Sequence, residues 1–138
     1  MQHFFKAFLL LTLSLIFIAC KKDYAKKMTG VYKGSTKYFL RDSSSAIKDT
    51  VLSESKITIE HAGSRNTVKI TISNLGMQDF VYKEVSVSGD KLQYVPAPMG
   101  GFAPTKIVGT LTDNTLLLSV EHRTTGPYAW TMDIKALK

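Results

Sequence analysis

A chain of 138 residues with a formal net charge of +7 is long enough for one domain and too short for two. Its basic residues are interspersed with acidic ones and accompany no recognition motif, which argues against a nucleic-acid partner. The single cysteine, Cys20, excludes an intramolecular disulfide.

The chain begins with a segment typical of an export signal. Residues 7–19 form an apolar run broken only by Thr12 and Ser14, and Lys6 supplies a positive charge in front of it. This run is shorter than the ~20 apolar residues that a membrane-spanning helix needs. A basic start, a short apolar core and a small residue at the cleavage point indicate a secretory signal peptide over residues 1–19.

The end of this segment resembles the lipobox of bacterial lipoproteins. Phe17-Ile18-Ala19-Cys20 places an apolar, a variable and a small residue directly before the cysteine, with Phe17 where the family usually has Leu. The resemblance implies that Cys20 is the lipid attachment site and the mature N-terminus, and several acyl chains make a durable membrane anchor. A plain signal peptide with an unmodified cysteine, or a signal anchor, is the alternative.

A basic stretch, KKDYAKK, follows the cysteine. We interpret residues 20–28 as the lipidated cysteine and a solvated basic tether, and contact with anionic head groups is the alternative. Lys21-Lys22-Asp23 is similar to the charged tracts that follow the lipid-bearing cysteine in surface-exposed lipoproteins of Bacteroidota. We therefore expect the protein in the cell envelope, lipid-anchored at the outer membrane, with its periplasmic or surface orientation undecided.

Residues 29–138 read as a single all-β domain, because short β-branched and aromatic runs alternate there with turn signals. The first expected strand covers residues 30–40, and alternation places four of its residues on one face: Tyr32, Gly34, Tyr38 and Leu40. Residues 47–56 are ambiguous, since Ser44 in the preceding polar loop could cap a short helix. We prefer a strand there.

The clearest strands have a period of two. Residues 68–72 alternate apolar with polar side chains, which indicates one buried and one wet face. The next strand changes phase between Tyr82 and Val85, so we expect a β-bulge near Lys83-Glu84. Ser88-Gly89-Asp90-Lys91 predicts a tight hairpin. Across the strands, the alternation predicts a buried stripe of Val68, Ile70, Ile72, Leu116, Leu118, Val120, Trp130 and Met132.

About eight strands joined mostly by short turns predict an antiparallel up-and-down meander, which closes naturally into a barrel. An open β-sandwich is the alternative. Gly30-Val31-Tyr32 is similar to the Gly-x-Trp that opens lipocalin and other calycin barrels, with Tyr in place of Trp. The whole domain resembles the small calycin-like lipoproteins of Bacteroidota, although its last strand lacks the Arg that usually covers that Trp. The resemblance implies binding rather than catalysis.

Few side chains of the chain are suited to catalysis or metal binding. We therefore expect no enzyme activity, no catalytic residue, no cofactor and no metal site. His61 and His122 each follow a glutamate near a strand end, and they could bind a metal only if the two strand ends met. No serine lies in a G-x-S-x-G frame. Gly100-Gly101 lacks the Lys-Ser/Thr and the helix that a phosphate-binding loop requires.

One loop is unusually apolar. Residues 95–105, VPAPMGGFAPT, hold three of the four prolines, which disqualifies them as a central strand. We expect this loop to close one barrel end, either as a plug or as the rim of a ligand or partner site. The candidate rim residues are Pro96, Pro98, Met99, Phe102 and Pro104.

Two functions fit these features. The first is a membrane-anchored, lipocalin-like binding module for a small apolar ligand, and the second is a non-enzymatic structural or accessory envelope protein whose filled barrel docks on a protein partner. An eight-stranded barrel is just wide enough for side chains or one small ligand. We expect its interior to be lined by Tyr32, Ile70, Tyr82, Tyr94, Leu118, Trp130 and Met132.

Overall fold

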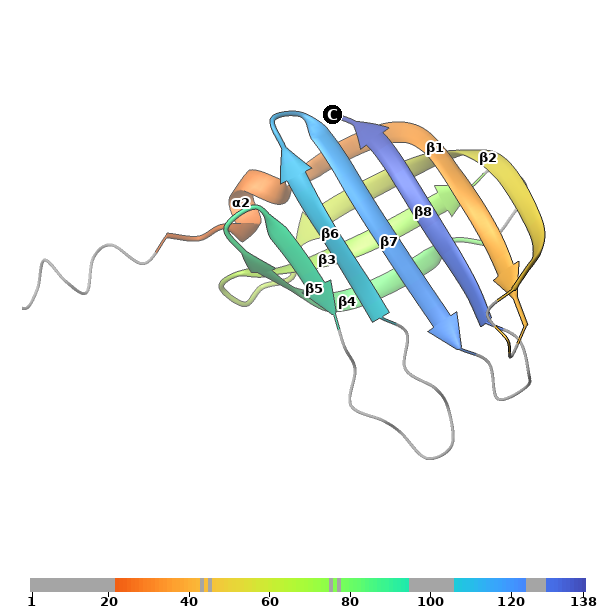
Figure 1. Ribbon diagram of the computed structural model, residues 1–138. Coiled ribbons are helices and arrows are strands. Elements are labelled where there is room, and N and C mark those ends of the chain that lie inside the picture. The colour runs from red at the N-terminus through yellow and green to blue at the C-terminus, as the bar shows by residue number, and fades with distance from the viewer. Residues whose placement is uncertain are drawn as a thin grey trace, which may run out of the picture.

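The computed structural model describes residues 22–42, 44, 46–74, 76, 78–94, 106–123 and 129–138. Its strands form one closed antiparallel barrel in which each strand pairs with the next along the chain and β8 pairs with β1 (Figure 1). The elements are α2 Ala25–Met28, β1 Gly30–Arg41, β2 Ile47–His61, β3 Thr67–Asn74, β4 Phe80–Ser88, β5 Lys91–Tyr94, β6 Lys106–Thr112, β7 Thr115–Arg123 and β8 Ala129–Leu137. The predicted all-β meander and its closure into a barrel are confirmed, and the sandwich alternative is wrong.

Strands β1 and β2 form a long hairpin, so the strand preferred for residues 47–56 is confirmed. Ser44 caps no helix. Instead, the side-chain Oδ1 of Asp42 accepts hydrogen bonds from the backbone N–H groups of Ser44 and Ala46, at 3.0 and 3.1 Å. Such a local bond closes the turn between the two strands in place of a helical cap.

The predicted β-bulge lies in β4. Val85 pairs with Val68 and Tyr82 pairs with Ile70, so Lys83 and Glu84 together oppose a single residue of β3. Glu84 takes a left-handed backbone conformation with φ of 60°, as one residue of a bulge often does. The extra residue changes the phase of the strand, so that Val85 and Val87 are buried although they are out of phase with Tyr82.

The barrel interior is filled mainly by aliphatic side chains. Every residue of the predicted buried stripe except Trp130 is at most 3% exposed, and Trp130 is half-buried against the core. Leu40 was expected on the same face of β1 as Tyr32, which is fully buried, but Leu40 is not buried. It lies at the rim, one residue before the end of β1, and is 38% exposed.

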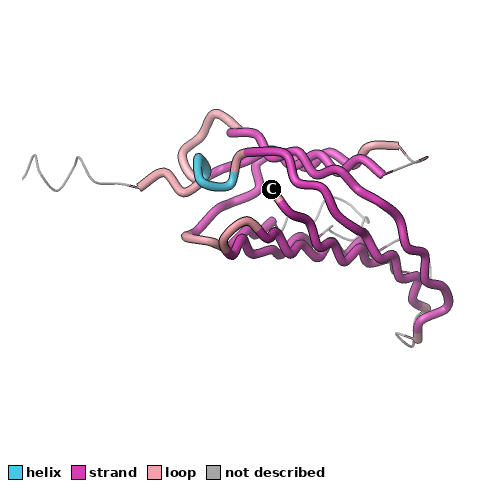
Figure 2. The backbone as a smooth tube through the Cα atoms, turned by 90° about the horizontal axis from the view of Figure 1, so that it is seen from above, coloured by secondary structure: helices cyan, strands magenta, loops and turns pink. Residues whose placement is uncertain are grey.

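The segment before β1 belongs to the barrel, and α2 covers one of its ends (Figure 2). Ala25 and Met28 are fully buried within the core cluster. They lie three residues apart on one side of a helical turn, so both apolar side chains reach the interior between exposed lysines. The solvated tether expected for residues 20–28 is therefore wrong for this turn.

Two further bonds hold this end in place. The buried hydroxyl of Tyr32 donates to the backbone carbonyl of Met28 at 2.7 Å, and the backbone N–H of Tyr24 donates to Asn66 Oδ1 at 2.8 Å. The Nζ of Lys138, directly after β8, lies 5.8 Å from the centroid of the Tyr32 ring, which is within the range of a cation–π contact. A cation thus covers this ring although β8 carries no Arg.

Candidate functional site

The end of the barrel opposite α2 is a second rim, which we call the far rim (Figure 1). Because all neighbouring strands are antiparallel, β1, β3, β5 and β7 end there and β2, β4, β6 and β8 begin there. Side chains at these strand ends that point inward therefore meet in one place.

Aromatic side chains from four strands, β1, β4, β5 and β8, gather at the far rim. Tyr38, Phe80, Tyr82, Tyr94 and Trp130 are half-buried and pack against the core. The ring centroids of Phe80 and Trp130 are 5.5 Å apart, and those of Tyr82 and Tyr94 are 6.4 Å apart. Both pairs are tilted, as aromatic pairs prefer. We call these five residues the aromatic cluster.

The imidazole of His122 extends this group of rings. It stacks on Trp130 with a centroid distance of 5.1 Å and an interplanar angle of 30°. A hollow of about 400 Å³ opens beside these two residues and is also lined by Gln78, Phe80 and Tyr82. Its size lies within the range of small-molecule sites.

Buried polar groups lie below the aromatic cluster. Thr36 Oγ1 and Ser55 Oγ are 2.5 Å apart, and Ser55 Oγ in turn donates to Asn74 Oδ1. All three residues are buried. Two buried polar atoms, the Tyr38 hydroxyl oxygen and Asn74 Nδ2, have no hydrogen-bond partner among the residues that the structure describes. A buried group without a partner costs roughly 1–3 kcal/mol.

The hydroxyls of Tyr38 and Tyr82 are held in their neutral form. Burial raises the pKa of Tyr82 to about 12, and the neighbouring Tyr38 and Tyr94 contribute to this increase. Burial also raises the pKa of Tyr38. These hydroxyls therefore donate hydrogen bonds at neutral pH and are poor candidates for a nucleophile or a general base.

The residues predicted for the barrel interior divide into two groups. Tyr32, Ile70, Leu118 and Met132 lie in the buried core, whereas Tyr82, Tyr94 and Trp130 belong to the aromatic cluster. The residue predicted to carry the lipid and the candidate rim residues lie outside the described part of the chain: Cys20, Pro96, Pro98, Met99, Phe102 and Pro104.

Sequence analysis missed two members of this site, the buried donors Tyr38 Oη and Asn74 Nδ2. A signal for Asn74 was present, because it continues the inward phase of Val68, Ile70 and Ile72 as a polar residue. A polar residue in a buried phase indicates either a satisfied network or a site.

The two histidines lie at opposite ends of the barrel, so the two strand ends that could have shared a metal do not meet. His61 closes a local network near α2, where its Nε2 lies 3.1 Å from Asp23 Oδ2 and its Nδ1 accepts the backbone N–H of Gly63. Desolvation alone would raise the pKa of Asp23, but hydrogen bonds from His61, Asn66 and Ala25 outweigh it and lower the pKa. Within the described ranges, no three potential metal ligands cluster.

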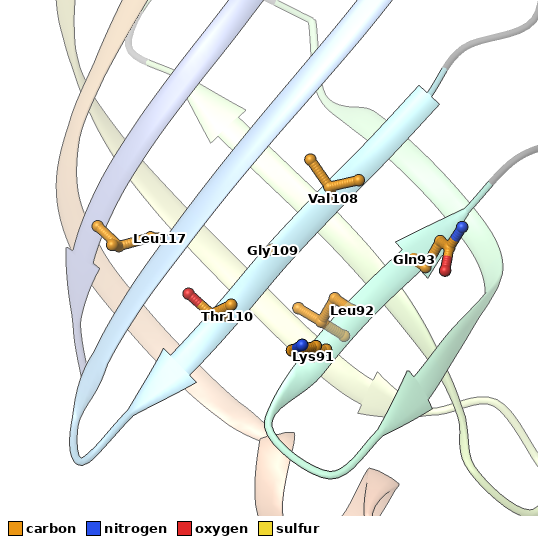
Figure 3. A pocket seen from close by; sticks show the side chains of 7 residues that line it. All are labelled: Lys91, Leu92, Gln93, Val108, Gly109, Thr110 and Leu117. Carbon is orange, nitrogen blue, oxygen red and sulfur yellow. The ribbon is translucent and has the colours of Figure 1, made fainter.

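A further hollow of about 380 Å³ lies on the outside of β5, β6 and β7, where Val108, Thr110 and Leu117 flank Gly109 (Figure 3). Its single charged residue is Lys91 at the start of β5. No buried polar atom without a partner lines it, among the residues described, so it lacks the convergent polar groups of the far rim.

Comparisons with known proteins bear on the fold alone. No family model and no curated protein matches this chain. A crystal structure of a protein of unknown function, from the DUF3598 family of Nostoc punctiforme PCC 73102, is similar, with a TM-score of 0.54 and 18% sequence identity. The similar region covers 86% of this chain and 47% of that protein, so the chain spans about half the length of this neighbour.

Proposed function

We propose that this protein is a non-enzymatic binding module that holds one small, largely apolar ligand at the far rim. The observation that supports it most is a pair of buried donors, Tyr38 Oη and Asn74 Nδ2, that have no hydrogen-bond partner in the described part of the chain, together with the half-buried aromatic rings. Rings from four strands offer flat apolar surfaces, and each of the two donors would bond an acceptor oxygen of the ligand. The preferred ligand is therefore an apolar molecule with a carbonyl, carboxylate or ether group.

Two tyrosines provide a matched test of this proposal. Tyr38→Phe removes a hydroxyl that has no partner in the described protein, so it should leave stability unchanged or slightly improved. It should weaken ligand binding roughly 5- to 10-fold, as expected for one hydrogen bond. Tyr32→Phe removes a hydroxyl bonded to Met28, so it should cost about 1–3 kcal/mol of stability and leave binding unchanged.

Binding is followed through Trp130, the single tryptophan of the chain and a member of the aromatic cluster. Long-chain fatty acids and anilinonaphthalene sulfonate serve as probes, because both combine an apolar body with acceptor oxygens. Mass spectrometry of protein purified from its own host would identify a natural ligand. If no probe changes Trp130 fluorescence and nothing co-purifies, the proposal is wrong.

A second candidate is an accessory envelope protein whose filled barrel docks on a protein partner. It is favoured by the α2 end of the barrel, where Met28 and Tyr32 are fully buried and close the interior with protein atoms. Tyr38→Phe would then alter neither stability nor the affinity of any apolar probe.

We also propose that Cys20 carries a lipid and anchors the barrel to the cell envelope, at the outer membrane. The support is the lipobox-like sequence before it. Among the described residues no helix is long and apolar enough to span a bilayer. Cys20→Ser should lower the mass by the lipid and move the protein out of the membrane fraction; an unchanged mass and location would contradict the proposal.

A further inference from the structure

The outer surface of β8, β1, β2 and β3 contains a basic groove that extends to Asn74 at the end of β3. This hollow of about 930 Å³ is lined by side chains that include Lys33, Lys56, Lys135, Glu54 and Leu137. All five residues are exposed. Three cations and one anion thus face the same concave surface.

The strand register forces these cations together. Lys33 and Lys56 occupy directly paired positions of β1 and β2. Lys135 pairs with Ser35 and is therefore the diagonal neighbour of Lys33 on the other side of β1. Like charges at directly paired positions of neighbouring strands destabilise a sheet. The fold alone therefore gives no reason to keep lysines at these positions.

Among the residues described, no carboxylate lies within ion-pair distance of these three lysines. None of the three lysines forms an ion pair among the residues that the structure describes, and Glu54 forms none with them. Elsewhere on the same barrel, Lys69 forms an ion pair with Glu60 at 2.6 Å, so paired lysines do occur on this surface. The basic groove presents positive charge that an external anion could balance.

Large apolar side chains are exposed around the basic groove. Leu137, which pairs with Lys33, is 58% exposed, and Val31 on β1 is 44% exposed. Leu52, which pairs with Lys37 on the same outer face, is 72% exposed. A soluble polyanion would not explain exposed leucines next to lysines. Lysines interleaved with exposed apolar side chains are typical of surfaces that lie on anionic lipid bilayers.

We propose that the outer face of β8, β1 and β2 lies on an anionic phospholipid surface, with lipid phosphates in the basic groove and Leu52 and Leu137 at the level of the head groups. This contact uses exposed lysines and leucines of the outer face, whereas the ligand site at the far rim uses aromatic rings and the buried donors Tyr38 Oη and Asn74 Nδ2; Asn74 borders both. The lipid contact does not depend on the anchor at Cys20, because the lysine register and the exposed leucines exist without it.

The test measures how fast each lysine is acetylated in the full-length protein on vesicles. The protein is reconstituted with either phosphatidylcholine or phosphatidylglycerol, pulsed with an acetylating reagent and analysed by mass spectrometry. On phosphatidylglycerol, Lys33, Lys56 and Lys135 should react about 5-fold more slowly than on phosphatidylcholine. Lys91 and Lys106, on the opposite strands β5 and β6, should react equally on both and serve as internal controls.

The two vesicle types separate this inference from the proposed anchor, because an acyl anchor inserts into both. Protection of all lysines alike, or equal protection on both lipids, would overturn the inference. So would protection by millimolar inorganic phosphate without vesicles, which would indicate a site for a soluble anion instead.

A triple variant adds an independent readout. Lys33→Gln, Lys56→Gln and Lys135→Gln together should abolish the lipid-dependent protection of Lys37, which lies on the same outer face. The matched pair Lys91→Gln and Lys106→Gln should retain it. Retained protection in the triple variant would contradict a role for the basic groove.

Discussion

Gly34 lies at a close approach of β1 and β8, the two strands whose pairing closes the barrel. A Cβ atom at this position would lie 2.0 Å from the carbonyl oxygen of Lys135 and 2.6 Å from the Cα of Ala136. These are backbone atoms, which cannot rotate away as a side chain does. Gly34→Ala therefore requires the two strands to separate by more than an ångström.

The magnitude follows from what that separation breaks. Gly34 pairs with Ala136 within a continuous β1–β8 ladder. Losing about two ladder hydrogen bonds costs about 1–3 kcal/mol net, and overpacking a tight site adds about 1–3 kcal/mol. Alanine also lowers the conformational entropy of the unfolded chain relative to glycine, which stabilises the folded state by only about 0.4–1 kcal/mol. We expect a net loss of about 3 kcal/mol, which is a large part of the ~5–15 kcal/mol that stabilises a typical domain.

Urea denaturation followed by circular dichroism and Trp130 fluorescence measures this loss. The matched control is Ser35→Ala, the next residue along β1, which points outward and is exposed. It should change the free energy of unfolding by no more than about 0.5 kcal/mol. If Gly34→Ala and Ser35→Ala unfold at the same urea concentration with the same slope, the close approach of β8 to β1 is wrong.

Three further predictions concern the core and the tyrosines. Met28→Ala should cost about 2–5 kcal/mol, because the side chain is fully buried, whereas Lys27→Ala should cost little; equal thermal melts would place α2 outside the barrel. Ile70→Ala should likewise cost about 2–5 kcal/mol and Thr71→Ala far less, and equal urea midpoints would contradict the register of β3. The free energy of unfolding should fall from about pH 10, where an unfolded tyrosine ionises, towards about pH 12, where Tyr82 ionises in the folded barrel. Tyr82→Phe should reduce this fall, as measured by urea denaturation across that pH range. If the free energy of unfolding depends on pH in the same way in both proteins, the prediction is wrong.

Features that follow local rules could be predicted from the sequence. The alternation in residues 68–72 needs only a period of two, and the bulge at Lys83-Glu84 shows as a change of phase within one strand. The hairpin at Gly89-Asp90 likewise depends on a few adjacent residues, and it joins β4 to β5 as expected.

Features that depend on distant pairing could not be predicted. The burial of Met28 depends on where the barrel places its α2 end, and the flanking lysines suggested a solvated segment instead. The burial of Tyr38 Oη without a hydrogen-bond partner among the described residues results from the closed arrangement of several strands. Lys33 and Lys56 lie opposite each other because of the register between β1 and β2. The alternation pattern within each strand does not determine this register.

The burial of α2 has a mechanical consequence for an anchored protein. Asp23 is already bonded to His61, so the free length between a lipid on Cys20 and the folded barrel ends at Asp23. Fully extended, that stretch reaches at most about 11 Å. This reach is comparable to one head-group layer, roughly 5–8 Å thick. A domain joined to its lipid by a long flexible linker can move through a large volume above the membrane. With this short linker, an anchored barrel would stay in contact with the bilayer and would bind ligands at the membrane surface.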